Sequence, residues 1–331
     1  MKAYFIIIRI RQLLTIAIFT ALFSLVLCSC EQHELCYNHN HMGVLDLKYD
    51  WSQAPYAKPQ SMFLYLFPTD STRTLKRDLV GYEGARLELE PKKEFSILSF
   101  NSDFNNDVVS DNGGREDIII STKPATYVDK VGFQVSSLPL VRGTEDSEIK
   151  CETDSIWSAT SENNVYLSLE KAYNNEDYQL TLSPKRLHAT YHITIKKVKN
   201  PIKIASGIAA TLSGINGSVK ASTGEKVGDN VIITFPMLLN EANGALEGSM
   251  NCFGYCEKEE VPNKLMVYTI LKDGSKWSYV YDVTDQIHHA EDPYNVHIVL
   301  DELPVPDVIG DNSGFSPGVD DWNVIDIPVK M

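Results

Sequence analysis

Apolar and polar residues alternate with a period of two along much of this chain, and this alternation constrains the fold more than any other feature. Successive side chains of a β-strand point to opposite faces, so the pattern predicts strands with one buried face. Six segments show it: residues 45–50, 86–90, 191–196, 277–283, 296–301 and 325–330. Two further runs, residues 62–67 and 265–271, are apolar on both faces, which indicates central strands between two layers.

Turn signals separate these segments, and helical signals are weak. Asp273-Gly274, Asn112-Gly113 and Asn216-Gly217 are dipeptides that favour tight turns between antiparallel strands. Residues 145–157 are the best candidate for a short helix, and the pattern supports a loop there almost as well. Strands at regular intervals without long helices predict an all-β protein of antiparallel β-sandwiches.

The first thirty residues have the features of an export signal. Basic residues precede an apolar run over residues 13–27, and the segment ends in Leu27-Cys28-Ser29-Cys30. A lipoprotein signal peptidase needs a small residue before a cysteine whose thiol receives the lipid. Cys30 meets this need because Ser29 precedes it, whereas bulky Leu27 precedes Cys28. We therefore predict lipidation at Cys30, with palmitate among the acyl chains.

An uncleaved membrane helix is the alternative to cleavage, and the cysteine doublet after the apolar run argues against it. Cleavage removes Lys2, Arg9 and Arg11 and no acidic residue, which takes the net charge from -14 to near -17. Such an acidic chain is not expected to bind nucleic acid or to dock tightly on anionic lipid, because both ligands are negatively charged. The predicted location is the outer membrane, with the lipid as a tether and the body exposed at the surface.

The chain is long enough for two domains, and its 43% hydrophobic content indicates packed cores. A polar, glycine-containing stretch near residues 140–160 follows a full set of predicted strands. Arg142, just before Gly143, is a candidate protease-sensitive position in this linker. We predict a signal peptide at 1–29, a lipidated tether at 30–42, a β-sandwich at 43–145, a linker at 146–159 and a second β-sandwich at 160–331.

The densest cluster of metal-ligating residues is His33, Cys36, His39 and His41. Imidazoles and a thiolate at such spacing can bind zinc or copper. The cluster lies close to the lipid site, where no rigid scaffold has begun, so preorganisation would be poor. A packing or capping role at the start of the first domain is therefore the favoured interpretation, and a metal site is the alternative.

Four cysteines remain after the predicted cleavage: Cys36, Cys151, Cys252 and Cys256. Four scattered thiols in a chain of this length do not make a disulfide scaffold. The spacing of Cys252 and Cys256 fits either a turn with packed thiols or a local disulfide. The sequence leaves the pairing of all four open.

Asp103, Asn105 and Asp107 imitate the start of a calcium-binding loop. An EF-hand also needs glycine at the sixth position and glutamate at the twelfth, and here these are Val108 and Gly114. A polar turn is the favoured interpretation, and an irregular cation site is the alternative.

Motifs for catalysis are missing from the sequence. It contains no Gly-x-Ser-x-Gly, no His-Glu-x-x-His and no phosphate-binding glycine loop. The adjacent His288 and His289 would point in opposite directions in extended chain, so a solvated loop is favoured there. We predict that the protein is not an enzyme and needs no cofactor.

The chain resembles the fimbrillin-like surface lipoproteins of Bacteroidales, in a branch without assigned activity. The resemblance covers essentially the whole mature chain and rests on the order of several short motifs. These are Cys36-Tyr-Asn-His39-Asn-His41, Tyr49-Asp50-Trp51-Ser52, Met62, Tyr65-Leu66-Phe67-Pro68, Phe95-Ser-Ile97-Leu-Ser-Phe100-Asn101, Asp273-Gly274, Asp282-Val283-Thr284, Gly314-Phe315, Val319 and Trp322.

The resemblance implies two transthyretin-like β-sandwich domains and export to the outer membrane. It also implies that related pilus subunits join by β-strand addition after a protease removes their N-terminal segment. From Glu31 to Leu47 this chain has no Arg or Lys, so an arginine-specific protease has no site there. We therefore expect a subunit that keeps its lipid.

Two functions are preferred over a third, a hydrolase with an unrecognised site, which a deep pocket with two close carboxylates would support. The favoured one is a structural or adhesive surface lipoprotein, such as a fimbrial anchor or accessory subunit, with other fimbrial subunits as partners. The alternative is a glycan- or metal-binding surface lipoprotein, in which exposed tryptophans or the histidine cluster would bind the ligand.

Overall fold

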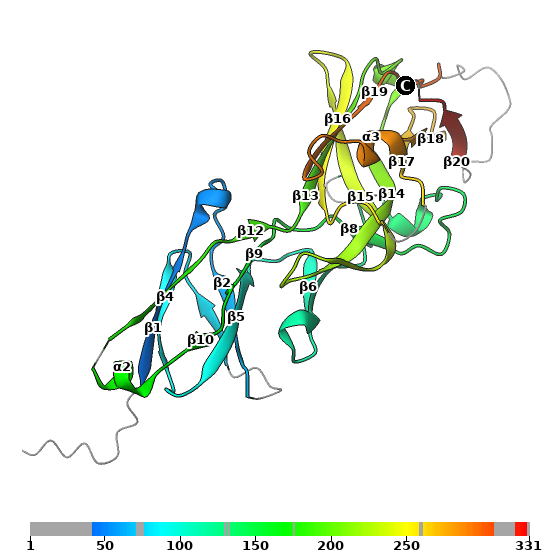
Figure 1. The fold of residues 1–331 in the computed structure, drawn as a ribbon. Coiled ribbons are helices and arrows are strands. Elements are labelled where there is room, and N and C mark those ends of the chain that lie inside the picture. Colours follow the sequence, from blue (N-terminus) through cyan, green and yellow to red (C-terminus); the bar gives the residue numbers. More distant parts are fainter. Residues whose placement is uncertain are drawn as a thin grey trace, which may run out of the picture. The chain divides into compact units, whose positions relative to one another are not determined.

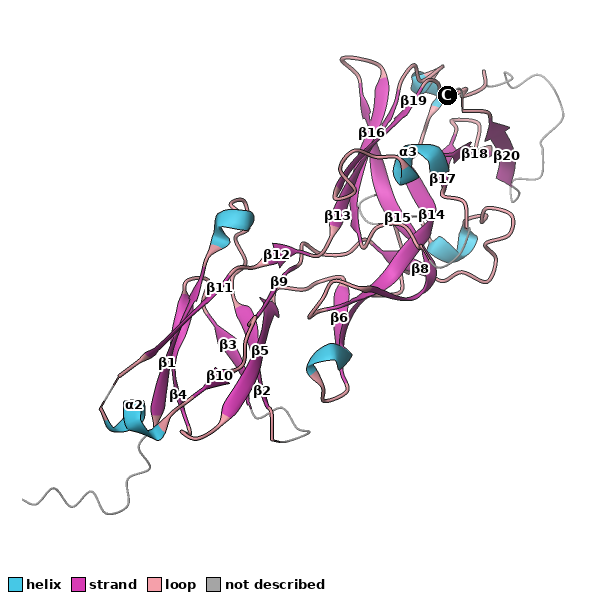
Figure 2. Ribbon diagram, viewed as in Figure 1, coloured by secondary structure: helices cyan, strands magenta, loops and turns pink. Residues whose placement is uncertain are grey.

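The computed structural model describes residues 42–70, 76–128, 131, 133–174, 176–257, 261–307 and 322–329. Contacts divide the chain into residues 1–41 and residues 42–331, and the described residues all belong to the second unit. Figure 2 shows that strands make up most of it, with a few short helices. The predicted all-β class is therefore confirmed. No helix among the described residues is both long and apolar enough to span a membrane.

A three-stranded sheet is built around the first strand, β1 (Gly43–Tyr49). β1 pairs antiparallel with β4 (Gly84–Leu89) and parallel with β11 (Tyr178–Leu182), so it is the middle strand (Figure 1). Its alternation predicts a half-buried strand, and the structure confirms this. Leu45 and Leu47 are fully buried, whereas Lys48 is exposed.

A six-stranded sheet shares a hydrophobic core with the first one. Its strands are β2 (Met62–Pro68), β3 (Lys76–Val80), β5 (Glu94–Asn101), β9 (Trp157–Thr160), β10 (Val165–Tyr166) and β12 (Lys185–Arg186). The main order is β12-β9-β5-β2-β3, with β10 on β5. β2 was predicted as a central strand, and it lies between β5 and β3. In the shared core, Leu45 and Leu87 join Leu64 and Ile97.

The remaining strands form an eleven-stranded sheet. They are β6 (Asp107–Asp111), β7 (Ile118–Thr122), β8 (Ile149–Cys151), β13 (Ala189–Ile195), β14 (Ile208–Lys220), β15 (Lys226–Asn240), β16 (Ala245–Cys252), β17 (Lys264–Ile270), β18 (Lys276–Asp282), β19 (Asn295–Leu300) and β20 (Trp322–Ile327). The main order is β19-β13-β16-β15-β14-β17-β18-β20. One hydrophobic core contains side chains from β13, β16 and β19 and also from β14, β17 and β18, so the sheet bends around this core.

The predicted turn at Asn216-Gly217 is wrong, because both residues lie inside β14. Type I′ turns need positive φ at both central residues, and Gly217 does not have it. The register between β14 and β15 shifts at this point instead. A Cβ on Gly217 would lie 2.8 Å from Val231 Cγ1, so the glycine permits close packing of the two strands. The chain turns later, at Gly224, whose φ is +74°.

Helices are short. Within the described residues, the two α-helices are α2 (Leu169–Tyr173) and α3 (Thr284–His288), and the 3-10 helices are η1 (Trp51–Gln53), η2 (Arg115–Asp117), η3 (Val135–Ser137) and η4 (Pro201–Lys203). The short helix considered for residues 145–157 is not formed. That segment contains turns and the strand β8, because Ile149 and Cys151 pair with β15.

The predicted domain boundaries at residues 145 and 160 stay a prediction. Strand pairing crosses them in both directions. β7 and β8 join β14 and β15 of the eleven-stranded sheet, whereas β9 and β11 join β5 and β1. A domain that contains one of these sheets therefore has to combine segments that are far apart in the sequence.

Candidate functional site

A polar groove lies beside β9, where a neighbouring strand ends early. β12 pairs with β9 only at Trp157 and Ser158. β9 continues to Thr160, and in the part of the chain that the structure describes no strand pairs with it on that side. Across from it, residues 180–187 pass from β11 in one sheet to β12 in the other. The groove between these segments encloses about 530 Å³.

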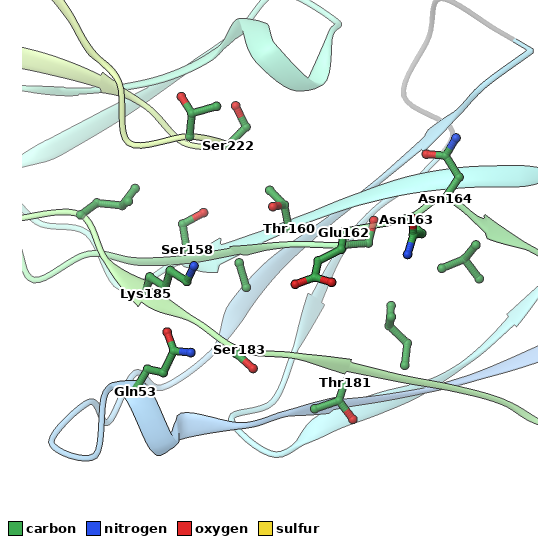
Figure 3. A pocket seen from close by; sticks show the side chains of 16 residues that line it. Gln53, Ser158, Thr160, Glu162, Asn163, Asn164, Thr181, Ser183, Lys185 and Ser222 are labelled. Carbon is green, nitrogen blue, oxygen red and sulfur yellow. The ribbon is translucent and has the colours of Figure 1, made fainter.

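Hydroxyl and amide side chains dominate the lining of this groove (Figure 3). They are Gln53, Ser158, Thr160, Ser161, Asn163, Asn164, Thr181, Ser183, Ser222 and Thr223. Glu162 and Lys185 are the two charged residues of the lining, and Ala159, Val165, Leu180 and Leu187 supply apolar surface. We call this set of residues the polar groove.

A few of these side chains are already used by the fold. The Ser158 hydroxyl donates to Ala221 O at 2.5 Å, and the Ser161 hydroxyl accepts from Ile97 N at 3.0 Å. The Ser222 hydroxyl donates to Glu116 Oε2 at 2.8 Å. These three serines tie the walls of the groove to the neighbouring backbone and turns, so they shape it.

Most of the polar side chains have no protein partner within the described part of the chain. They are Gln53, Thr160, Glu162, Asn163, Asn164, Thr181, Ser183 and Lys185. Glu162 and Lys185 form no ion pair among the described residues, and their formal charges cancel. The groove is therefore electrically neutral within a strongly acidic protein, and most of its hydrogen-bonding capacity is open to solvent or to a ligand.

The candidate site residues at the N-terminus lie outside the described residues. This applies to the predicted lipidation site Cys30 and to the cluster of His33, Cys36, His39 and His41. Arg142 is described, and it is exposed in a turn. These assignments stay predictions.

The two neighbouring cysteines are free thiols in the structure. Cys252 ends β16, and Cys256 follows after a turn at Gly254, whose φ is +80°. Both thiols are buried, and burial raises the pKa of Cys252 to about 12. Of the two interpretations left open, packed thiols agree with the structure and the local disulfide does not.

Asp107 is buried and connects two loops. Its Oδ2 atom accepts hydrogen bonds from Thr153 Oγ1 at 2.8 Å and from Asp154 N at 2.7 Å. Asp154 Oδ2 in turn accepts from Asn105 N at 2.8 Å and from Asn106 N at 2.7 Å. Residues 103–106 therefore agree with the polar turn that the sequence favours, whereas Asp107 is the buried first residue of β6. Nowhere among the described residues do three or more His, Cys, Asp or Glu side chains form a group that could hold a metal ion.

The two adjacent histidines lie at the end of α3, not in a loop. His288 stacks on Tyr255 with ring centroids 4.2 Å apart, and its Nε2 atom lies 3.0 Å from Asn263 Oδ1. His289 faces Asp285, with 2.8 Å between Nδ1 and Oδ1. The expectation that the two rings point to different places is confirmed, because each has its own partner.

The four tryptophans do not form an exposed row. Trp51 stacks on Tyr82 at 4.8 Å, and Trp157 meets the ring of His188 edge-on. Trp277 packs against the largest core, and Trp322 contacts the ring of Tyr268. Their rings are half-buried, so they do not present the flat aromatic platform that the glycan-binding alternative would use.

The chain belongs to the DUF5119 family, described as a domain of unknown function, whose family model matches residues 29–236. No curated protein matches the sequence. The fold is similar to that of a candidate adhesin from Bacteroides ovatus, with 14% identity and a TM-score of 0.57 over 84% of this chain and 99% of that one. At this identity the match shows a shared fold, and it confirms the structural resemblance to a candidate adhesin of Bacteroidales.

Two further structures align over most of their length with lower scores. The fimbrial anchor protein Mfa2 from Porphyromonas gingivalis has 10% identity and a TM-score of 0.48, over 78% of this chain and 90% of that one. A candidate cell adhesion protein from Bacteroides eggerthii has 13% identity and a TM-score of 0.45, over 88% and 100%.

Reasoning from the sequence missed the polar groove. Its one local signal is the run of hydroxyl, acidic and amide residues from Thr160 to Asn164, at the end of β9. Such runs are also typical of solvated loops. The groove further needs residues 180–187 and 222–223, which only the strand pairing brings to it.

Proposed function

We propose that this protein is a lipid-anchored component of the outer-membrane surface with a structural or adhesive role, such as a fimbrial anchor or accessory subunit. The lipoprotein-type signal at Cys30, the all-β body and the lack of catalytic motifs support this role. The fold shared with a candidate adhesin is compatible with it. Two tandem β-sandwiches of transthyretin type, following the signal, are the finer description of the fold within this proposal.

The observation that carries the proposal is the position of β1. β1 begins thirteen residues after Cys30 and is hydrogen-bonded on both sides, to β4 and β11. A pull on the tether would have to break both sets of backbone bonds at once, because the central strand is held along two edges. The first strand after the lipid site is thus well suited to hold a body to a membrane.

The distribution of basic residues supports a permanent anchor. Between Glu31 and Leu47 the chain has no Arg or Lys, and the first Lys or Arg after Cys30 is Lys48. Lys48 lies in β1, where pairing on both sides protects the backbone from a protease. A trypsin-like or arginine-specific protease would therefore leave the tether intact.

Membrane retention tests the anchor directly. Cys30→Ala removes the predicted lipid-bearing thiol, so we expect the protein to move from the membrane fraction to the soluble fraction and to lose incorporation of labelled palmitate. Cys28→Ala is the matched control, because it alters a cysteine two residues away and should leave both readouts unchanged.

Protease shaving of intact cells, with mass spectrometry of the retained N-termini, completes the test. We expect the mature chain to begin at Cys30 and to stay with the cells. A surface form that begins at or beyond Lys48 would contradict the permanent anchor. Equal loss of retention in the two cysteine variants would contradict the lipid site itself.

Partners of this protein are proposed to be fimbrial subunits that join by β-strand addition. Such joining needs an open sheet edge, and β3 and β20 are edge strands of their sheets. Leu79 on β3 and Val324 on β20 are exposed apolar side chains at these edges, with 62% and 53% of their surface accessible. The two edge strands therefore offer an incoming strand free backbone groups, and these side chains offer it apolar contact.

A further inference from the structure

We propose that the polar groove beside β9 binds a neutral saccharide. The surface role proposed above does not assign a ligand, and this proposal does not depend on the lipid anchor or on fimbrial partners. The groove encloses about 530 Å³, within the range of roughly 300–1,000 Å³ that is usual for ligand sites. Its size therefore suits a short oligosaccharide segment.

The chemistry of the lining matches sugar hydroxyls. Thr160, Thr181 and Ser183 carry hydroxyls that can donate and accept, and the amides of Asn163 and Asn164 offer both kinds of group. A sugar hydroxyl also donates and accepts, so it can bond to either. None of these five side chains is occupied by a protein partner in the described residues.

Apolar surface among these polar groups fits the carbon–hydrogen faces of a sugar ring. Val165, Leu180 and Leu187 are half-buried, so part of each side chain is open to the groove. Ligand sites commonly combine such apolar surface with a few polar groups that orient the ligand. The groove thus has both components, arranged on the two segments that border it.

Electrostatics favour a neutral ligand. Glu162 and Lys185 are the two charged residues that line the groove, and both point toward its open space in Figure 3. Their opposite charges give no net attraction for a phosphate or a metal cation. Because the protein as a whole carries a net charge of -14, an anionic polysaccharide would also be repelled.

A peptide strand is the competing occupant, because β9 has an open edge beyond Ser158. Strand addition draws its specificity from pockets for alternate side chains of the peptide. Here the side chains beside the open edge are Thr160, Glu162 and Asn163, which offer hydrogen bonds and a charge and not the alternating apolar contacts that a peptide strand would need. The lining therefore favours a saccharide over a peptide.

Calorimetric titration of the full chain after its predicted signal tests the proposal. The probes are oligosaccharides of mannan, dextran, xylan and N-acetylglucosamine as neutral ligands. Polygalacturonate serves as the acidic ligand, and a peptide with the sequence of residues 322–329 serves as the strand. We expect at least one neutral saccharide to bind, with an affinity that changes little with salt because the ligand is uncharged.

Matched variants locate the binding. Thr160→Val and Asn163→Ala each remove hydrogen-bonding groups from the groove, and each should weaken binding by roughly tenfold. Thr194→Val and Asn112→Ala make the same changes at a half-buried strand position and an exposed turn away from the groove. These two controls should bind like the wild type. Thermal unfolding of all four variants verifies that they are folded, and Asn163 is exposed, so its variant should fold normally.

Three results would overturn the proposal. One is that none of the neutral saccharides binds. Another is that the groove variants and the control variants bind equally well. The last is that only polygalacturonate or only the peptide binds, which would identify an acidic ligand or a strand as the occupant. None of these results bears on retention at the membrane, so failure here is distinct from failure of the proposed anchor.

Discussion

Asp107 shows how burial changes the chemistry of one carboxyl group. Its side chain is buried, and although Oδ2 accepts two hydrogen bonds, Oδ1 has no partner among the described residues. Burial raises the pKa of Asp107 to about 7, and the charge of Asp154 adds to this, whereas the bonds from Asp154 N and Thr153 oppose it. The proton of Asp107 thus stays bound at pH values where other carboxyl groups have lost theirs.

The raised pKa predicts how stability depends on pH. Unfolding returns the Asp107 pKa to about 3.9, so between pH 4 and pH 7 the folded state binds the proton more tightly. The stabilising contribution of Asp107 to the free energy of unfolding is therefore fully present below about pH 4, and it is lost as pH rises through 7. Asp107→Asn removes this dependence. We expect the unfolding free energy of the wild type, relative to the variant, to fall by on the order of 2 kcal/mol between pH 5 and pH 8.

The comparison with the variant is needed because His188 acts in the opposite direction. Burial lowers its pKa to about 4, with the charge of Arg186 as a second cause. The contribution of His188 to the free energy of unfolding is fully present above about pH 6.5, and it is lost as pH falls toward 4. Urea denaturation of both proteins at pH 5, 6, 7 and 8 cancels this shared term. A constant difference between the two across that range would show that Asp107 is already ionised in the folded protein.

Gly84 is a second residue whose identity the backbone dictates. Its φ is +126°, and a Cβ there would lie 1.9 Å from Leu47 O in the neighbouring strand β1. Gly84→Ala should therefore force β1 and β4 apart, and we expect it to destabilise the fold by about 3 kcal/mol or more. Chemical denaturation measures this change.

Gly143 provides the matched control for that substitution. Its φ is +89°, and a Cβ there would meet no atom within 4 Å. Gly143→Ala should cost only the conformational term of about 1 kcal/mol. Equal losses at the two positions would mean that the contact with Leu47 is not the cause of the larger effect.

At the scale of elements, β20 is the edge strand that covers β18 in the eleven-stranded sheet. It pairs parallel with β18 from Trp322 to Ile327. Trp322 Nε1 donates to Ser137 O at 2.9 Å, and its ring lies 5.4 Å from that of Tyr268. The last described strand thus covers a small apolar cluster that the rest of the chain builds.

Truncation tests the contribution of this strand. A chain that ends before Trp322 loses the pairing and the packing of the half-buried indole, and we expect its unfolding free energy to fall by about 3 kcal/mol, the lower end of the cost of removing a buried Trp side chain. A chain that ends before Lys330 keeps β20 and should match the wild type. Equal stability of the two truncated chains in denaturation would show that β20 contributes nothing to the fold.

Eight of the strands could be predicted from the sequence because their signal is local. Leu45 and Leu47 are buried while Lys48 is exposed, as the alternation requires. Two predictions failed where a distant partner decides the conformation. Ile149 and Cys151 are extended because β15 pairs with them. Gly217 remains in a strand because Val231 of β15 packs against it.

At the scale of the molecule, the proposed function connects an acidic body with a lipid tether. A net charge near -17 after cleavage would keep the body away from anionic lipid, so the lipid alone would hold it at the membrane. β1 is where this tether would enter the body, and its central place in a sheet suits that role. The polar groove would then be available to a ligand outside the cell.

The sequence by itself indicated the class of fold and eight of the strands, and it carries the prediction of the lipid site, because each depends on residues that are neighbours in the chain. The tertiary structure alone decided which strands pair and that Asp107 is buried. It also decided that residues near positions 53, 160, 181, 185 and 222 line one groove. The physical reason is that pairing between distant strands depends on how whole faces pack, and no local pattern records which partner a strand will have.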